Sequence, residues 1–135
     1  IKIKGCAEQG PAKGMLWYGE LEKTQSAEQL GQHLADRLNR QPLHLSSSGR
    51  QAVKTVGWCT GGAQGYIEQA AAMGLDAYIS GEVSEQTFHL ARELDIHYFA
   101  AGHHATESYG VQALGRHLAE QFNLEVGFID VSNPV

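Results

Sequence analysis

The sequence has few cysteines and no long apolar segment. Its 135 residues include two cysteines, Cys6 and Cys59, which are far apart and form no CxxC pair. We therefore expect no disulfide framework or thiolate zinc site, and the reducing cytoplasm is the simplest location. No apolar run reaches the roughly 20 residues that span a bilayer, and the first residues do not resemble a signal peptide. A membrane partner is therefore not expected.

An excess of basic residues is also absent. Ten Lys and Arg stand against fifteen Asp and Glu, so the formal net charge is −5. Because neutralising phosphates requires surplus Lys and Arg, this charge argues against nucleic acid as a partner. Hydrophobic residues make up 42% and charged residues 19%, which is typical of globular proteins. With no repeat or linker dividing the sequence, residues 1–135 are expected to form a single unit.

The pattern of apolar residues predicts alternating strands and helices. Ser26 and Gln29 have the spacing of a capping box, which opens a predicted helix that ends near Arg40. A later helix is expected to stop at Gly74, with Leu75 closing its end. The predicted strands are 1–6, 16–21, 43–45, 53–59, 77–80 and 97–101. Strands joined through helices indicate an α/β fold, with a mostly parallel or mixed sheet and helices packed on it.

The end of the chain carries one more helix pattern and one more strand pattern. Residues 108–122 have helical periodicity, and we expect this helix to turn four apolar side chains to the core: Val111, Leu114, Leu118 and Phe122. Residues 125–129 are predicted to form a final strand.

Polar residues and glycines follow three of the predicted strands. They lie in segments 60–62, 81–82 and 102–107, which contain glycines, carboxylates and imidazoles. Because the carboxyl ends of parallel strands meet at one edge of a sheet, where ligands bind in open α/β folds, we expect these segments to converge.

His103 and Glu107 are the strongest candidate ligands. In the first turn of a helix their side chains share a face, and in a loop Gly102 lets the backbone approach an ion. In either case an imidazole nitrogen and a carboxylate oxygen suit a divalent cation such as Zn, Mn, Fe or Ni. The alternative is a solvated helix start, with Glu107 favoured by the helix dipole. Two ligands do not complete a catalytic site, which needs about three.

The neighbouring polar residues have two interpretations each. His104 is a candidate second ligand or outer partner, although a residue next to a ligand more often points away. Glu82 can orient a ligand from outside the metal shell or can be an ordinary first-turn carboxylate. The Gly61-Gly62 pair suits phosphate at a helix start, but without a P-loop Lys a plain turn is favoured. Among the other histidines only His89 is kept in reserve, because it follows Glu82 by one to two helical turns.

Several segments of the sequence resemble one known family. They are AYISGEVSEQT at 77–87, AAGHHATE at 100–107 and FIDVSNP at 128–134, with WYGEL at 17–21 and WCTGG at 58–62 upstream. Together they are similar to the YbgI branch of the Nif-three-like family, whose members are often called GTP cyclohydrolase 1 type 2 homologues. The likeness covers nearly the whole chain.

The resemblance implies a cytoplasmic α/β protein that forms a ring-shaped homohexamer with two metal ions in each intact subunit. In the family pattern, the positions of His103 and Glu107 are metal ligands. The remaining ligands, an adjacent His-His pair and an Asp, lie in the family's N-terminal half. Residues 1–135 correspond to the C-terminal half, so they are expected to hold metal poorly alone.

Two functional hypotheses follow. Two adjacent cations can activate a water and stabilise charge on a phosphoryl or carbonyl oxygen, which favours hydrolysis of a small, nucleotide-like substrate. The alternative is a non-enzymatic metal-binding ring scaffold or protein-interaction module. A simple nucleotide-binding domain that uses Gly61-Gly62 is a weaker third reading. The sequence assigns no catalytic residue.

Overall fold

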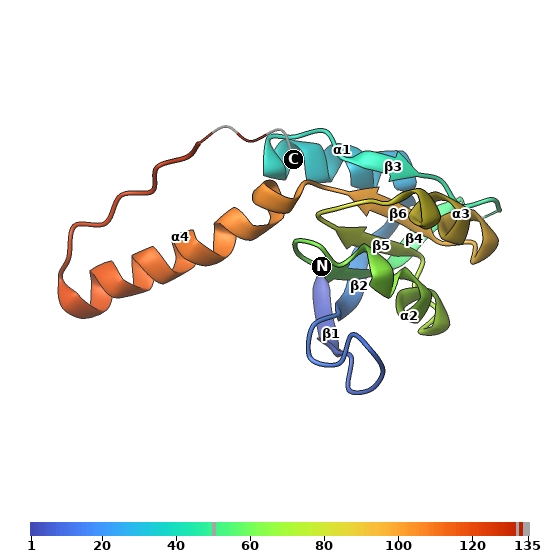
Figure 1. The fold of residues 1–135 in the computed structure, drawn as a ribbon, viewed down its shortest axis with the longest axis horizontal. Helices are drawn as coiled ribbons and strands as arrows, with labels where there is room; N and C mark the ends of the chain where they lie inside the picture. Colours follow the sequence, from blue (N-terminus) through green and yellow to red (C-terminus); the bar gives the residue numbers. More distant parts are fainter. Residues whose placement is uncertain (50, 132, 134–135) are drawn as a thin grey trace.

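The computed structural model describes residues 1–49, 51–131 and 133. It is an α/β structure in which helices lie on both faces of one sheet (Figure 1). The strands and helices in chain order are β1 (Lys2–Cys6), β2 (Trp17–Ser26), α1 (Ala27–Leu38), β3 (Leu43–Leu45), β4 (Ala52–Cys59), η1 (Gln64–Tyr66), α2 (Ile67–Ala72), β5 (Ala77–Ser80), α3 (Glu85–Glu93), β6 (His97–Ala100) and α4 (His103–Phe122).

The sheet is mixed. Its strand order is β1-β2-β4-β5-β6-β3. The central strands β4, β5 and β6 run parallel, while β1, β2 and β3 pair antiparallel with their neighbours. The predicted α/β class is confirmed. Helix α2 joins β4 to β5, and α3 joins β5 to β6. Neighbouring parallel strands need such crossover connections.

Side chains of the central strands alternate between two cores. Tyr78 and Tyr98 point to the face covered by α2 and α3, whereas Ile79 and Phe99 point to the face covered by α1. All residues of β5 and β6 are buried, as expected of parallel strands with helices on both sides. The body of the molecule is therefore a three-layer structure with a rigid centre.

Two helix ends match the sequence prediction closely. At the start of α1, Gln29 N donates to Ser26 Oγ and Ser26 N donates to Gln29 Oε1, which completes the capping box. At the end of α2, Gly74 has φ +73° and Leu75 N donates to the carbonyl of Ala70. This pattern is the predicted Schellman end.

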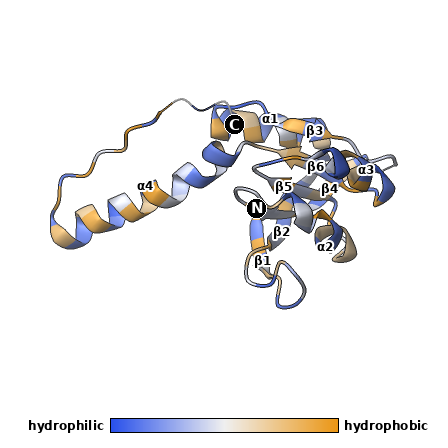
Figure 2. Cartoon of the chain, viewed as in Figure 1, coloured by the Kyte–Doolittle hydropathy of each residue, from blue (hydrophilic) through white to orange (hydrophobic). Residues whose placement is uncertain are grey.

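The end of the chain corrects two predictions. Helix α4 begins at His103 and not at 108, and none of its residues is buried. Of the four side chains expected in the core, Val111, Leu114 and Phe122 are 55–66% exposed, and Leu118 is only partly covered. Residues 125–129 form no strand. The helix leaves the body, and the following segment returns alongside it (Figures 1 and 2). The apolar periodicity was real, but within the described residues only the segment after α4 comes near it, and most of the apolar side chains stay exposed.

Within the described residues, we find no helix with the length and apolar character needed to cross a membrane.

Candidate metal site at the edge of the sheet

The three glycine-containing segments meet at one edge of the sheet, as predicted. The carbonyl of Gly61, after β4, accepts from the backbone N of Gly81, after β5, at 3.0 Å. The carbonyl of Gly81 accepts in turn from the N of Gly102, after β6, at 2.9 Å. Ser80 Oγ also donates to Gly61 O, at 3.2 Å. These bonds hold the start of α4 against the ends of the parallel strands.

Two glycines make this close approach possible. A Cβ on Gly81 would lie 2.8 Å from the Cα of His103, which real Cβ atoms do not tolerate. A Cβ on Gly61, whose φ is +68°, would lie 3.1 Å from His103 Nε2 and against the carboxylate of Glu107. The absence of side chains here leaves open the space that the imidazole and the carboxylate share.

The ring of His103 lies between two carboxylates. Its Nδ1 is 2.6 Å from Glu82 Oε1, and its Nε2 is 3.2 Å from Glu107 Oε1. Segment 103–107 is therefore the first helical turn, with both side chains on one face. All three side chains are 39–55% exposed, so the pair is open to solvent and to a ligand.

The spacing fits a shared cation. Two neighbouring ligands about 2.0–2.2 Å from one octahedral or tetrahedral metal are separated by roughly 2.8–3.6 Å. The separation of His103 Nε2 and Glu107 Oε1, 3.2 Å, falls in this range. A metal-binding imidazole usually donates its second nitrogen to a carboxylate, and Glu82 stands in that position. Glu82 is thus placed as an outer partner of His103, which is one of the two interpretations given by the sequence.

The electrostatics of the pair follow from these contacts. The hydrogen bond to Glu82 raises the pKa of His103, and the charge of Glu107 adds to the effect. The same hydrogen bond lowers the pKa of the Glu82 carboxyl. Because a cation at Nε2 must replace a proton, metal binding here competes with protonation up to a higher pH than for an ordinary histidine.

Sequence reasoning missed the residues that support Glu82 and the glycine turn. Gln64 Nε2 donates to Glu82 Oε2 at 3.4 Å, and the Tyr98 hydroxyl donates to the Glu82 carbonyl. The Gln64 Oε1 atom is buried and has no hydrogen-bond partner among the described residues. Thr106 Oγ1 donates to Gly102 O at 2.9 Å and accepts from Gly61 N at 3.2 Å. The sequence signal that could have identified Thr106 was its position in the HHATE segment.

The other candidate histidines lie apart from this pair. His104 Nε2 is 3.2 Å from Asp130 Oδ1, in the segment after α4, so its side chain has a partner of its own. His89, on α3, packs edge-on against Phe88 with ring centres 5.4 Å apart. The structure therefore brings together His103, Glu107 and Glu82 and no other candidate.

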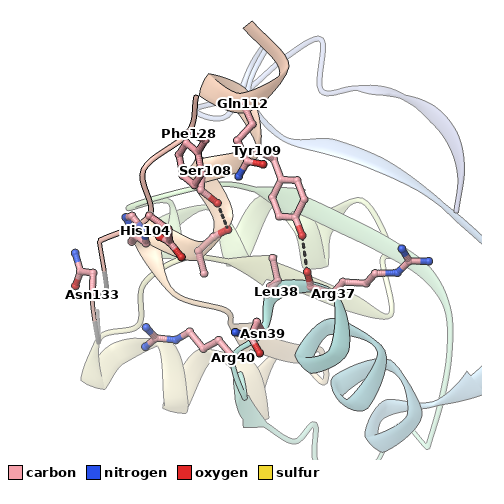
Figure 3. Close-up of a pocket in the computed structure, with 12 residues that line it drawn as sticks. Arg37, Leu38, Asn39, Arg40, His104, Ser108, Tyr109, Gln112, Phe128 and Asn133 are labelled. Carbon is pink, nitrogen blue, oxygen red and sulfur yellow. Dashed lines mark hydrogen bonds and ion pairs between the residues drawn. The ribbon is translucent and has the colours of Figure 1, made fainter. Parts of the chain in front are cut away.

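Two hollows flank the first turn of α4. The larger, here called the polar hollow, has a volume of about 790 Å³ and lies between the end of α1, α4 and the final segment (Figure 3). Its lining includes Arg37, Asn39, Arg40, His104, Ser108 and Asp130. The smaller hollow, about 250 Å³, is almost wholly apolar, with Leu34, Trp58 and Thr106 in its wall.

The described residues do not form a complete set of metal ligands. They contain no group of three or more His, Cys, Asp or Glu side chains that could hold an ion together. His103 and Glu107 are two candidate ligands, whereas a catalytic site needs about three.

The curated relatives of this chain are longer than the part that it matches. The 54%-identical GTP cyclohydrolase 1 type 2 homolog of Allochromatium vinosum is matched over 91% of this chain and 48% of its own length. The homolog of Escherichia coli K12 is 45% identical, over 98% and 53% respectively. The chain spans about half the length of the curated relatives it matches.

Solved structures give the same family and fold. A structure described as protein ybgI, of unknown function, matches with a TM-score of 0.92 and 44% identity over the whole of this chain and 53% of its own. HcgD from Methanocaldococcus jannaschii shares the fold, with a TM-score of 0.76 at 21% identity over 93% of this chain and 48% of its own. The family model described as Duf34/NIF3 (NGG1p interacting factor 3) matches residues 1–134. This chain therefore belongs to the Duf34/NIF3 family.

Proposed function

We propose that this chain supplies His103 and Glu107 to a two-metal centre in a longer protein, and that the intact protein hydrolyses a small, nucleotide-like substrate. The observation that carries the proposal is the 3.2 Å separation of His103 Nε2 and Glu107 Oε1, with Glu82 holding the other ring nitrogen. The GTP cyclohydrolase 1 type 2 names of the relatives support a nucleotide-like substrate.

Each residue has a defined part in this proposal. His103 and Glu107 bind one of two divalent ions, of Zn, Mn, Fe or Ni type, while Glu82 orients the imidazole ring. Such ions, roughly 3.5–4 Å apart, supply an activated water and stabilise charge on a phosphoryl or carbonyl oxygen. Gly61 and Gly62 leave the space next to the backbone to the side chains of His103, Glu107 and Glu82. The remaining ligands come from the half of the relatives that this chain does not match.

The exposed apolar side chains of α4 support the proposal that this chain is part of a larger assembly. Large apolar side chains along α4 and the segment after it are exposed, among them Leu114, Phe122 and Ile129. Monomeric proteins rarely expose so extended an apolar surface. We propose that the other half of the intact protein, and further copies in a ring hexamer, cover it. The same surface favours the second candidate function, a metal-binding ring scaffold without enzymatic activity.

The proposed setting is the cytoplasm. Cys6 and Cys59 are both free thiols, which is compatible with a reducing compartment.

The decisive experiment is elemental analysis of this chain alone and of the chain extended by the N-terminal half. We expect sub-stoichiometric metal in the first and about two ions per subunit in the second. His103→Ala and Glu107→Ala should each reduce the metal content of the extended protein. His117→Ala, at an exposed position of the same helix, is the matched control. Unchanged metal content in both ligand variants would contradict the proposal.

Activity and assembly separate the two candidates. For a hydrolase, turnover on a panel of nucleotides and phosphate esters should fall together with the metal content in the ligand variants. For a scaffold, light scattering should give a ring mass that survives both substitutions, and the unmodified protein should show no turnover on the same panel.

A further inference from the structure

Arg40 lies against Gly102, the residue that precedes the candidate ligand His103. Its backbone is held at the end of α1, where Asn39 is left-handed with φ +50° and Arg40 N donates to Ala35 O at 3.2 Å. Its side chain crosses Gly102, the residue before His103. A Cβ on Gly102 would fall 2.7 Å from Arg40 Nε and 2.9 Å from Cζ. The guanidinium therefore packs against the backbone next to His103.

The Arg40 guanidinium is unpaired within the part of the chain that the structure describes. Among the described residues, no carboxylate or other acceptor is bonded to it, although the side chain is partly buried. The one carboxylate named in the wall of the polar hollow, Asp130, is engaged by His104. Figure 3 shows the Arg40 guanidinium on the same side of the hollow as His104, while the side chain of Arg37 is directed away. Arg40 thus faces an open, polar space with an unused charge.

The positive charge and the planar donors of Arg40 favour an anionic ligand. Arg presents a planar set of donors that matches the oxygens of a phosphate and can bind two of them at once. The polar hollow, at about 790 Å³, is within the usual size of small-molecule sites, about 300–1,000 Å³. Its lining includes His104 and Ala105, which belong to the same first turn of α4 as His103 and Glu107.

We infer that Arg40 and the polar hollow form a phosphate-binding subsite, which holds a phosphoryl group of the ligand while the rest of that ligand reaches the His103–Glu107 pair. This inference rests on the proposed function for the ligand's second point of attachment. Arg40 acts in it as a positioning residue, and Gly102 is required because any side chain there would push the guanidinium out of place.

The test is calorimetric titration of the intact protein with inorganic phosphate at constant ionic strength. Removing a charge-assisted hydrogen bond usually costs enough to weaken binding about tenfold or more, so we expect that loss in Arg40→Gln. Arg40→Lys keeps the positive charge but loses the planar pair of donors. Its phosphate affinity should lie between those of the unmodified protein and Arg40→Gln. Arg116→Gln, which removes the same charge from an exposed position on α4, should leave the affinity unchanged.

The outcomes separate this inference from the proposed function. Phosphate affinity that is equal in Arg40→Gln and Arg116→Gln overturns the subsite, and so does acetate that binds as tightly as phosphate. Circular dichroism should show that Arg40→Gln is folded. The metal content of this variant should equal that of the unmodified protein. Arg40-dependent phosphate binding in a protein without metal would sustain the subsite while the proposed metal centre fails.

Discussion

Strand β6 and helix α4 are separated by two residues and lie at opposite extremes of burial. All four residues of β6 are buried, whereas none of the twenty residues of α4 is. Both elements contain aromatic and aliphatic side chains, so composition alone does not explain the difference. It lies in what surrounds them: β6 is covered by helices on both faces, and α4 extends away from the body (Figure 1). The candidate ligands His103 and Glu107 occupy the junction between the two regions.

The strongest test of this contrast is a pair of large-to-small substitutions. Phe99 in β6 is 0% exposed and Phe122 in α4 is 66% exposed. Phe99→Ala should reduce the free energy of unfolding by about 3–5 kcal/mol, because it leaves a cavity in the core. Phe122→Ala should change it by no more than about 0.5 kcal/mol. Urea denaturation of the chain measures both. Similar losses would show that α4 is part of the folded body.

At the junction, removing the outer partner of His103 should weaken metal binding. Glu82→Gln deletes the carboxylate that orients the ring, and such losses typically reduce metal affinity about 10–100-fold. Competition with a chelator in the intact protein measures the affinity. Glu85→Gln, an exposed carboxylate at the start of α3, is the control and should bind metal normally.

The same variant has a second, independent readout. Because the hydrogen bond to Glu82 raises the pKa of His103, Glu82→Gln should shift the imidazole titration to lower pH. NMR titration of the metal-free protein follows it directly. An unmoved titration would mean that Glu82 does not contact the ring in solution.

A smaller effect on stability is expected from an alanine in the glycine turn. Gly61 and Gly14 have nearly the same φ, +68° and +74°, but a Cβ on Gly14 meets no atom within 4 Å. Each substitution to Ala should cost about 1–2 kcal/mol of backbone strain. Only Gly61→Ala should also reduce metal content, since its Cβ enters the space beside His103 Nε2. Equal metal content in the two variants would contradict the proposed position of the ion.

The smallest effect concerns the outer edge of the sheet, far from the junction. His44 Nε2, on β3, is 3.1 Å from His97 Nδ1 on β6, and His44 stacks on Phe99. Burial lowers the pKa of His44, and the neighbouring His97 lowers it further, against the opposing charge of Glu28. The unfolded chain therefore takes up a proton that the folded chain resists, and stability falls as pH drops below the ordinary histidine value of about 6.5.

His44→Gln should make the unfolding midpoint less dependent on pH between about pH 7 and pH 5. His33→Gln, at an exposed position on α1, should leave that dependence as it is. Thermal unfolding at a series of pH values measures both. A steeper dependence in His44→Gln would reverse the assigned sign.

Local signals in the sequence were enough for most elements. The Ser26–Gln29 box, the Gly74 helix end and the strand patterns up to residue 101 depend on residues close together in the sequence, and the structure confirms them. The convergence of glycines and polar residues at one edge followed from parallel strands alone. The pair His103 and Glu107 was found because both residues lie in the same helical turn.

Contacts between distant segments were decided only by the tertiary structure. Glu82 and Gln64 are joined by a hydrogen bond, and Arg40 crosses Gly102, but neither pair shares a local pattern that the sequence could reveal. The wrong prediction that the apolar side chains of α4 lie in the core has the same origin. A periodic apolar stripe reports that a helix has a face to bury, because side-chain spacing is local. What covers that face depends on the surfaces that the rest of the chain brings to it, and the described residues leave most of it exposed.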